Sequence, residues 1–388
     1  PSPEPVPRLA SPRPWPDSGS PIDTQRGARL PRRAAVASVR FTGQTSAPPL
    51  HRLPGMTTSP APPATATATS PTLHLGHSPD PDDAFMWWPL ANFTLADGTA
   101  LTPRIDTAGY TFVHVLEDIQ SLNERAERAE LELTAISIHQ YPFVARDYAL
   151  TSCGASMGEG YGPMIVTKSG TGPVFATGSS DAGNDPAAAP AASPAPNIQG
   201  LRGTRLAIPG RRTSAWLACQ LLLHEHGLSG DDVDARVVAF DEIIPAVAQG
   251  DFDAGLLIHE GQLTYQDAGL TEVVNLGKWW QDTRGLPLPL GGNAIRRDLG
   301  EAMPTVCRVL LDSIRHAMEH RDAAVDFALR WARGMGKDLA DRFVGMYVND
   351  RTLDYGPDGR AAVQRLLTEA AAAGLVPDVG EVDFVEPA

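Results

Sequence analysis

The sequence predicts an α/β protein with two lobes and a ligand cleft between them. From residue 72 onward, short apolar runs alternate with longer helical stretches, which is typical of strands and helices around a largely parallel sheet. A second series of such runs begins after residue 200, as expected for one lobe inserted into the other. Polar residues follow several of the strands, and the carboxyl ends of strands are where open α/β sheets bind ligands.

The elements follow one another in a regular order. Apolar runs of strand length are bounded by turn residues, whereas helices show apolar positions three or four apart, as at Leu217 and Leu221. Pro81 suits the first turn of the first helix. Strands are expected at 73–76, 111–115, 133–138, 164–167, 205–208, 236–240, 254–258 and 272–275. Helices are expected at 83–91, 118–129, 214–225, 243–249, 306–320, 323–333 and 360–373.

Composition divides the chain into four kinds of segment. Residues 1–72 are rich in Pro, Ser, Ala and Thr, so they cannot bury enough apolar surface to fold and are expected to be disordered. Arg32 and Arg33 precede too weak an apolar stretch for a twin-arginine signal. A biased stretch over 170–197 is expected to be a surface-loop insertion or an inter-domain linker. The first lobe is predicted to comprise 73–169 and 286–388, and the second 198–285.

The bulk composition excludes some classes of binding partner. The chain has 388 residues and a net charge of −14, which argues against nucleic acid or an anionic membrane surface. No apolar run approaches the roughly 20 residues that span a bilayer. The three cysteines have no pairing or metal-binding spacing, which suits a reducing cytoplasm. We expect a cytoplasmic protein with a small-molecule substrate; the oligomeric state is not predicted.

An acidic loop over 78–83 links the first strand to the first helix. It would present a helix amino terminus to the cleft, lined by Ser78 and Asp83, where an anion or the hydroxyl groups of a ligand would bind. The simpler interpretation is that Asp82 or Asp83 caps the helix. Its carboxylates would also suit magnesium, but no histidine or spaced acid supports a metal site, and none is expected.

The loop over 208–215 repeats this arrangement in the second lobe. Thr213 and Ser214 open a helix, where hydroxyl and free N–H groups would bind a carboxylate, although either residue would also serve as a simple N-cap. The Gly-Lys-Thr ending of a phosphate-binding loop is missing. The glycine-rich stretch over 154–163 precedes a strand, so we expect it to cross near the cleft and not to bind a dinucleotide.

His259 is the main catalytic candidate. It directly follows a buried strand, and imidazole is the commonest general base near neutral pH. A lone histidine is more often a hydrogen-bonded structural residue. Glu260 need not orient His259, because neighbours on a strand point to opposite faces. No nucleophile elbow supports a serine hydrolase.

Six ordered motifs together resemble one enzyme family. They are 78–85, 209–215, 258–260, 264–265, 285–291 and 347–350. The chain resembles the 1,4-dihydroxy-6-naphthoate synthases of the futalosine route to menaquinone, from about residue 73 to about 376, interrupted only by the biased insertion.

The resemblance implies a fold similar to periplasmic binding proteins, used by a cytoplasmic lyase without a cofactor. Such an enzyme cleaves cyclic dehypoxanthinylfutalosine to 1,4-dihydroxy-6-naphthoate and a ribose-derived fragment. The matching histidine, His259, is implied as the proton acceptor. The implied substrate contacts are Ala135, Ile136, Ser137, Thr213 and Ser214.

The chain departs from the family pattern in three places. The family often has Lys where Ala135 stands, so that cationic contact is either absent or supplied by Arg211 or Arg212. The usual Cys-Pro-Asn-Asp-Thr becomes 80–84, which adds negative charge near the cleft, and Ser214 stands where Thr is common.

Two other functions compete with this one. Chorismate dehydratase of the same pathway has a similar fold, but the segments 259–261 and 347–350 favour the naphthoate synthase. A solute-binding protein of a transporter would need a secretion signal, which the Pro-rich start does not provide convincingly.

Overall fold

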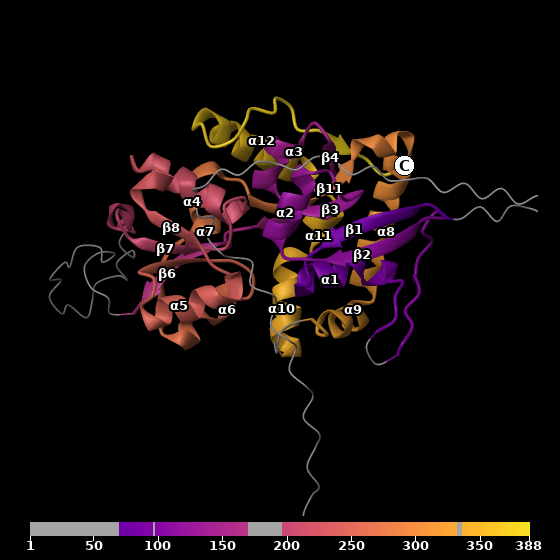
Figure 1. Cartoon of the computed structure of the whole chain (residues 1–388), viewed down its shortest axis with the longest axis horizontal. Helices are drawn as coiled ribbons and strands as arrows, with labels where there is room; N and C mark the ends of the chain where they lie inside the picture. The colour runs from indigo at the N-terminus through magenta and orange to yellow at the C-terminus, as the bar shows by residue number, and fades with distance from the viewer. Residues whose placement is uncertain (1–69, 96–97, 170–195, 332–335) are drawn as a thin grey trace, which may run out of the picture. The chain divides into compact units, whose positions relative to one another are not determined.

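Two β-sheets form the framework of the chain (Figure 1). The computed structural model describes residues 70–95, 98–169, 196–331 and 336–388. The extension expected over 1–72 and the insertion expected over 170–197 therefore lie almost wholly outside the described residues. Both sheets belong to one compact unit, Thr67–Ala388. No helix in the described part of the chain has the length and apolar character that crossing a membrane requires.

The first sheet joins strands from both ends of the described chain. Their order is β12-β4-β11-β3-β1-β2, and β5 pairs with β11. All five residues of β3 are buried, as its central place requires. The strands are β1 (Thr72–His77), β2 (Thr111–Leu116), β3 (Leu133–Ser137), β4 (Tyr148–Thr151), β5 (Ser156–Gly158), β11 (Leu288–Arg296) and β12 (Phe384–Val385).

The second sheet comes from the middle of the chain, in the order β10-β6-β9-β7-β8. Its central strand β9 is wholly buried, and His259 follows the end of this strand. The strands are β6 (Met164–Lys168), β7 (Arg205–Ile208), β8 (Asp234–Val237), β9 (Ala254–Leu257) and β10 (Leu270–Asn275). The strand expected at 236–240 therefore starts and ends earlier, and Phe240–Glu242 form a short 3₁₀ helix instead.

Both sheets are largely parallel, as the sequence predicted, but each contains one strand that runs against the others. In the first sheet, β11 runs antiparallel to β3, β4 and β5. In the second, β6 runs antiparallel to β9 and β10. Each of these strands is the first that the chain forms after crossing from the other sheet. β6 follows β5 with no helix between them, whereas α7 lies between β10 and β11.

The crossing into the second sheet lies in the glycine-rich stretch between β5 and β6, as the sequence predicted. The predicted first lobe (73–169) contains β6, but this strand pairs within the second sheet. The other boundaries stay predictions. A side chain on Gly277 would overlap the carbonyl oxygen of Tyr161, so this crossing needs a glycine at that position.

Helices cover both sheets. Residues of α1, α8 and α9, far apart in sequence, share one hydrophobic cluster with β1 and β2 (Figure 1). A larger cluster joins α4 and α12 to strands of both sheets. The helices are α1 (Pro81–Trp87), α2 (Ile119–Glu127), α3 (Tyr141–Val144), α4 (Ser214–Glu225), α5 (Ile243–Gln249), α6 (Gly261–Thr264), α7 (Leu276–Arg284), α8 (Met303–Glu319), α9 (Arg321–Ala328), α10 (Lys337–Tyr347), α11 (Asp350–Leu353) and α12 (Gly356–Ala372).

Candidate active site

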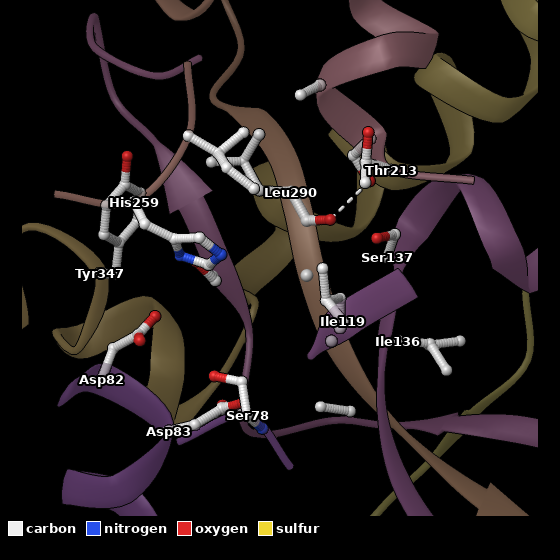
Figure 2. A pocket seen from close by; sticks show the side chains of 18 of the residues that line it. Ser78, Asp82, Asp83, Ile119, Ile136, Ser137, Thr213, His259, Leu290 and Tyr347 are labelled. Carbon is white, nitrogen blue, oxygen red and sulfur yellow. Dashed lines mark hydrogen bonds between the residues drawn. The ribbon is translucent and has the colours of Figure 1, made fainter. Parts of the chain in front are cut away.

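One pocket takes its walls from both sheets, and the sequence-predicted site residues all line it. They are Ser78, Asp83, Ala135, Ile136, Ser137, Thr213, Ser214 and His259. The pocket holds about 770 Å³ that protein atoms do not fill, including its opening to solvent. That space suits a ligand of metabolite size. Figure 2 shows His259, Asp82, Asp83 and Ser78 on one side of the pocket, with Thr213 and Ser137 across from them.

His259 lies just beyond the carboxyl end of β9, and its backbone conformation is strained. Its φ is +50°, in the left-handed region that non-glycine residues seldom adopt. Its ring lies edge-on to Phe240, with 4.8 Å between ring centroids, and 6.3 Å from that of Phe343. Such strain persists only where the surrounding structure holds the residue in place, and it is found mostly at functional sites.

Carboxyl groups at the start of α1 lie near the His259 ring. Its Nε2 lies 3.4 Å from Oδ2 of Asp80, which is almost fully buried. Burial lowers the pKa of His259, but the carboxylates of Asp80, Asp82, Glu260 and Asp83 outweigh it, so that the pKa is raised. The imidazole therefore holds a proton more readily than one in water.

The acidic loop does not cap its helix in the expected way. The N-cap residue of α1 is Asp80, and its side chain accepts no hydrogen bond from the helix. Asp83 instead reaches back, and its Oδ2 accepts a hydrogen bond from Ser78 N at 2.8 Å. Burial raises the pKa of Asp82, and burial together with the charge of Asp82 raises that of Asp83. The expectation that Asp82 or Asp83 caps the helix start is thus wrong.

On the opposite side of the pocket, Thr213 caps α4, as one interpretation of the sequence held. Its Oγ1 accepts a hydrogen bond from Trp216 N at 3.2 Å and donates to Gly210 O at 2.9 Å. The Ser214 hydroxyl donates to Leu290 O and accepts from His139 N at 3.2 Å. Both hydroxyl protons are therefore already engaged within the protein.

On the same side of the pocket, the Ser137 hydroxyl still has a proton that it can donate to a ligand. Its Oγ accepts a hydrogen bond from Asn123 Nδ2 at 3.1 Å, and its backbone N donates to Asn123 Oδ1 at 2.9 Å. No acceptor for the Ser137 hydroxyl proton lies among the described residues. A ligand oxygen in the pocket would complete that bond.

No lysine or arginine is among the described residues that line the pocket. Arg211 Nη2 donates to Ala235 O at 2.9 Å. The Arg212 guanidinium lies 3.6 Å over the Phe143 ring and donates to Glu127. Neither arginine supplies the cation that Ala135 lacks. No group of three or more metal-ligating side chains with suitable geometry occurs among the described residues.

Residues 73–372 match the sequence profile of a family described as menaquinone biosynthesis. The chain belongs to this family. Two curated members are each 35% identical to it, and both are named 1,4-dihydroxy-6-naphthoate synthase. The Streptomyces coelicolor protein aligns over 310 residues, which cover 80% of this chain and 96% of the relative. The Thermus thermophilus protein aligns over 304 residues, which cover 78% and 95%.

Solved structures support the fold of this family member. An Archaeoglobus fulgidus protein is 38% identical, with a TM-score of 0.63 over 79% of this chain and 98% of its own. An alkanesulfonate-binding protein from Xanthomonas axonopodis has a TM-score of 0.54 at 13% identity, over 81% and 98%. The Escherichia coli periplasmic sulphonate-binding protein has 0.52 at 12%, over 82% and 92%. The predicted periplasmic-binding-protein-like fold is confirmed.

Several residues that line the pocket of this family member were not predicted from the sequence. Phe343 and Tyr347 come from α10, and the Tyr347 hydroxyl donates to Gln262 Oε1 at 2.9 Å. Asn293 lines the pocket from β11; its Nδ2 donates to Gly154 O at 3.0 Å, while its buried Oδ1 has no partner among the described residues. Only the motif at 347–350 carried a signal for any of them, because β11 and α10 were not predicted.

Proposed function

We propose that the protein is a 1,4-dihydroxy-6-naphthoate synthase, a carbon–carbon lyase of menaquinone biosynthesis that converts cyclic dehypoxanthinylfutalosine, with His259 as its general base. The observation that carries the proposal is the place of His259 in a two-sheet pocket of a chain 35% identical to two enzymes of that name. The fold alone would also suit a solute-binding protein, but the family match favours the enzyme.

Charge supports one orientation of the substrate. On the side of Asp82 and Asp83, burial and neighbouring carboxylates raise the pKa values of both groups, so these surroundings disfavour a further negative charge such as a substrate carboxylate. Across from that side, the Ser137 hydroxyl and the first backbone N–H groups of α4 provide hydrogen-bond donors next to the positive end of the helix dipole. We therefore place the substrate carboxylate at Ser137, Thr213 and Ser214, where Ala135 and Ile136 contribute apolar wall.

His259 would then face the part of the substrate that reacts. Neutral imidazole takes a proton from a substrate carbon, and the electron pair left behind forms a double bond as the carbon–carbon bond to the ribose-derived fragment breaks. The fragment leaves with the electrons of that bond and takes up a proton, and formation of the aromatic ring favours the products. Because the pKa of His259 is raised, we expect kcat/KM to fall on the acid side with an apparent pKa above about 6.5, the ordinary histidine value.

Replacement of His259 tests the proposal. His259→Asn suits the left-handed backbone and removes the base, so product formation should fall by at least about 100-fold while the thermal midpoint changes little. His224→Gln, on the exposed end of α4, is the matched control and should stay active. Product is followed with cyclic dehypoxanthinylfutalosine and, separately, with chorismate. An active His259→Asn enzyme, or turnover of chorismate by the wild type, would contradict the assignment.

We also place the enzyme in the cytoplasm, where a biosynthetic enzyme meets its substrate. The buried thiols of Cys153, Cys219 and Cys307 are compatible with a reducing compartment. Cell fractionation with an antibody against the chain would test this, and recovery outside the cytoplasmic fraction would contradict it.

A further inference from the structure

Asp80 occupies the N-cap position of α1 but does not act as a cap. Its backbone is extended, as an N-cap requires, and aspartate is among the best capping residues. Nevertheless the side chain accepts no hydrogen bond from the first turn. Only 6% of the residue is exposed. A carboxylate buried in this way needs a charged or hydrogen-bonded partner elsewhere.

That partner is His259 from the other sheet. Asp80 Oδ2 lies 3.4 Å from His259 Nε2, and the side chains are 8% and 18% exposed. Asp80 follows β1 of the first sheet, whereas His259 follows β9 of the second. The pair therefore forms only where the two sheets meet, and it joins the candidate base, which follows a strand of the second sheet, to a helix start that follows a strand of the first.

The remaining surroundings of the ring do not replace this partner. Phe240 and Phe343 contact it with their rings and carry no charge. The Tyr347 hydroxyl donates to Gln262. The other charged groups that face it are Asp82, Asp83 and Glu260, but none lies within ion-pair distance of the ring among the described residues.

We propose that Asp80 is the positioning residue of His259: its carboxylate fixes the imidazole against the strained backbone at that position and stabilises the ring once it has taken a proton. The catalytic part of this inference rests on the proposed function, whereas the pairing itself does not. A charge at this distance in a buried site favours imidazolium over imidazole. It also keeps the ring in one orientation, which a proton transfer needs.

The pairing is tested without any substrate. Histidine ring signals are followed by NMR over a pH series, and the His259 signal is identified by its loss in His259→Asn. In Asp80→Asn, which keeps the side-chain shape, we expect the pKa of His259 to fall by about 1 unit or more. Asp82→Asn and Glu260→Gln are matched controls, because each removes one nearby charge but no ion pair, so each should lower it less. An unchanged pKa in Asp80→Asn would overturn the proposal.

Activity tests the positioning role. For Asp80→Asn we expect kcat to fall by about 10-fold or more with KM nearly unchanged, and the acid limb of kcat/KM to move to lower pH. Asp80→Ser provides a second variant with a residue that suits a helix start. A lower kcat without a shift of the acid limb in either variant would mean a merely structural role. If wild-type enzyme gives no product but the NMR shift appears, the proposed function fails and the pair stands.

Discussion

Two helix starts face each other across the pocket, and they use their polar side chains in opposite ways. At α4, the Thr213 and Ser214 hydroxyls each make two hydrogen bonds within the protein. At α1, Asp80 leaves its helix uncapped and turns to His259, while the pKa values of Asp82 and Asp83 are raised. The sequence presents both as a strand, a polar loop and a helix.

The difference between the two helix starts distinguishes polar residues that stabilise the structure from polar residues that bear on the reaction. Satisfied hydroxyls fix the backbone, so in the proposed function the α4 start would bind substrate through its rigid N–H groups and through Ser137 beside it. The α1 start instead concentrates buried charge near a strained histidine, which is the usual setting of perturbed pKa values at functional sites. Variants at the α4 start should therefore change stability first, and variants at the α1 start should change chemistry first.

The largest stability effect is expected at Ser214. Ser214→Ala leaves Leu290 O and His139 N without their hydroxyl partner, which should cost about 2 kcal/mol in the free energy of unfolding. Urea unfolding measures the change. Ser156→Ala is the control, because this serine lines the same pocket and its hydroxyl bonds to none of the described residues. Equal losses in the two variants would break the comparison.

A smaller loss is expected at Thr213. Thr213→Ala removes the α4 cap and should cost about 1 kcal/mol, whereas Thr213→Ser keeps the hydroxyl and should cost less. Thermal unfolding of both variants gives the difference. An α4 start that tolerates alanine as well as serine would show that the cap is not what holds it.

An effect of opposite sign is expected at Asp83. Burial and Asp82 raise its pKa, so above about pH 4 the folded chain retains a proton that the unfolded chain has lost. The free energy of unfolding therefore falls as the pH rises through the raised pKa. Asp83→Asn should remove that dependence and so raise the free energy of unfolding near neutral pH. Urea unfolding at pH 5 and pH 8 tests this; a loss of stability at both would contradict it.

Much of the fold followed from local pattern. The runs at 205–208 and 243–249 became β7 and α5 with the bounds expected. The long strand β11 was missed because its Pro and Gly residues, at 289, 291 and 292, are typical of loops. Its neighbours on both sides supply the hydrogen bonds that override that preference.

The sequence by itself determined the family, the fold class and part of the pocket lining, because these depend on local apolar pattern and on motifs that follow strands. It could not decide which polar residues pair. Asp80 was expected merely to add charge near the cleft, and Arg211 or Arg212 was a candidate for the missing cation. Only the tertiary structure brought Asp80 of the first sheet to His259 of the second and turned both arginines away from the pocket. Side-chain partners depend on how distant elements pack, and no local pattern encodes that.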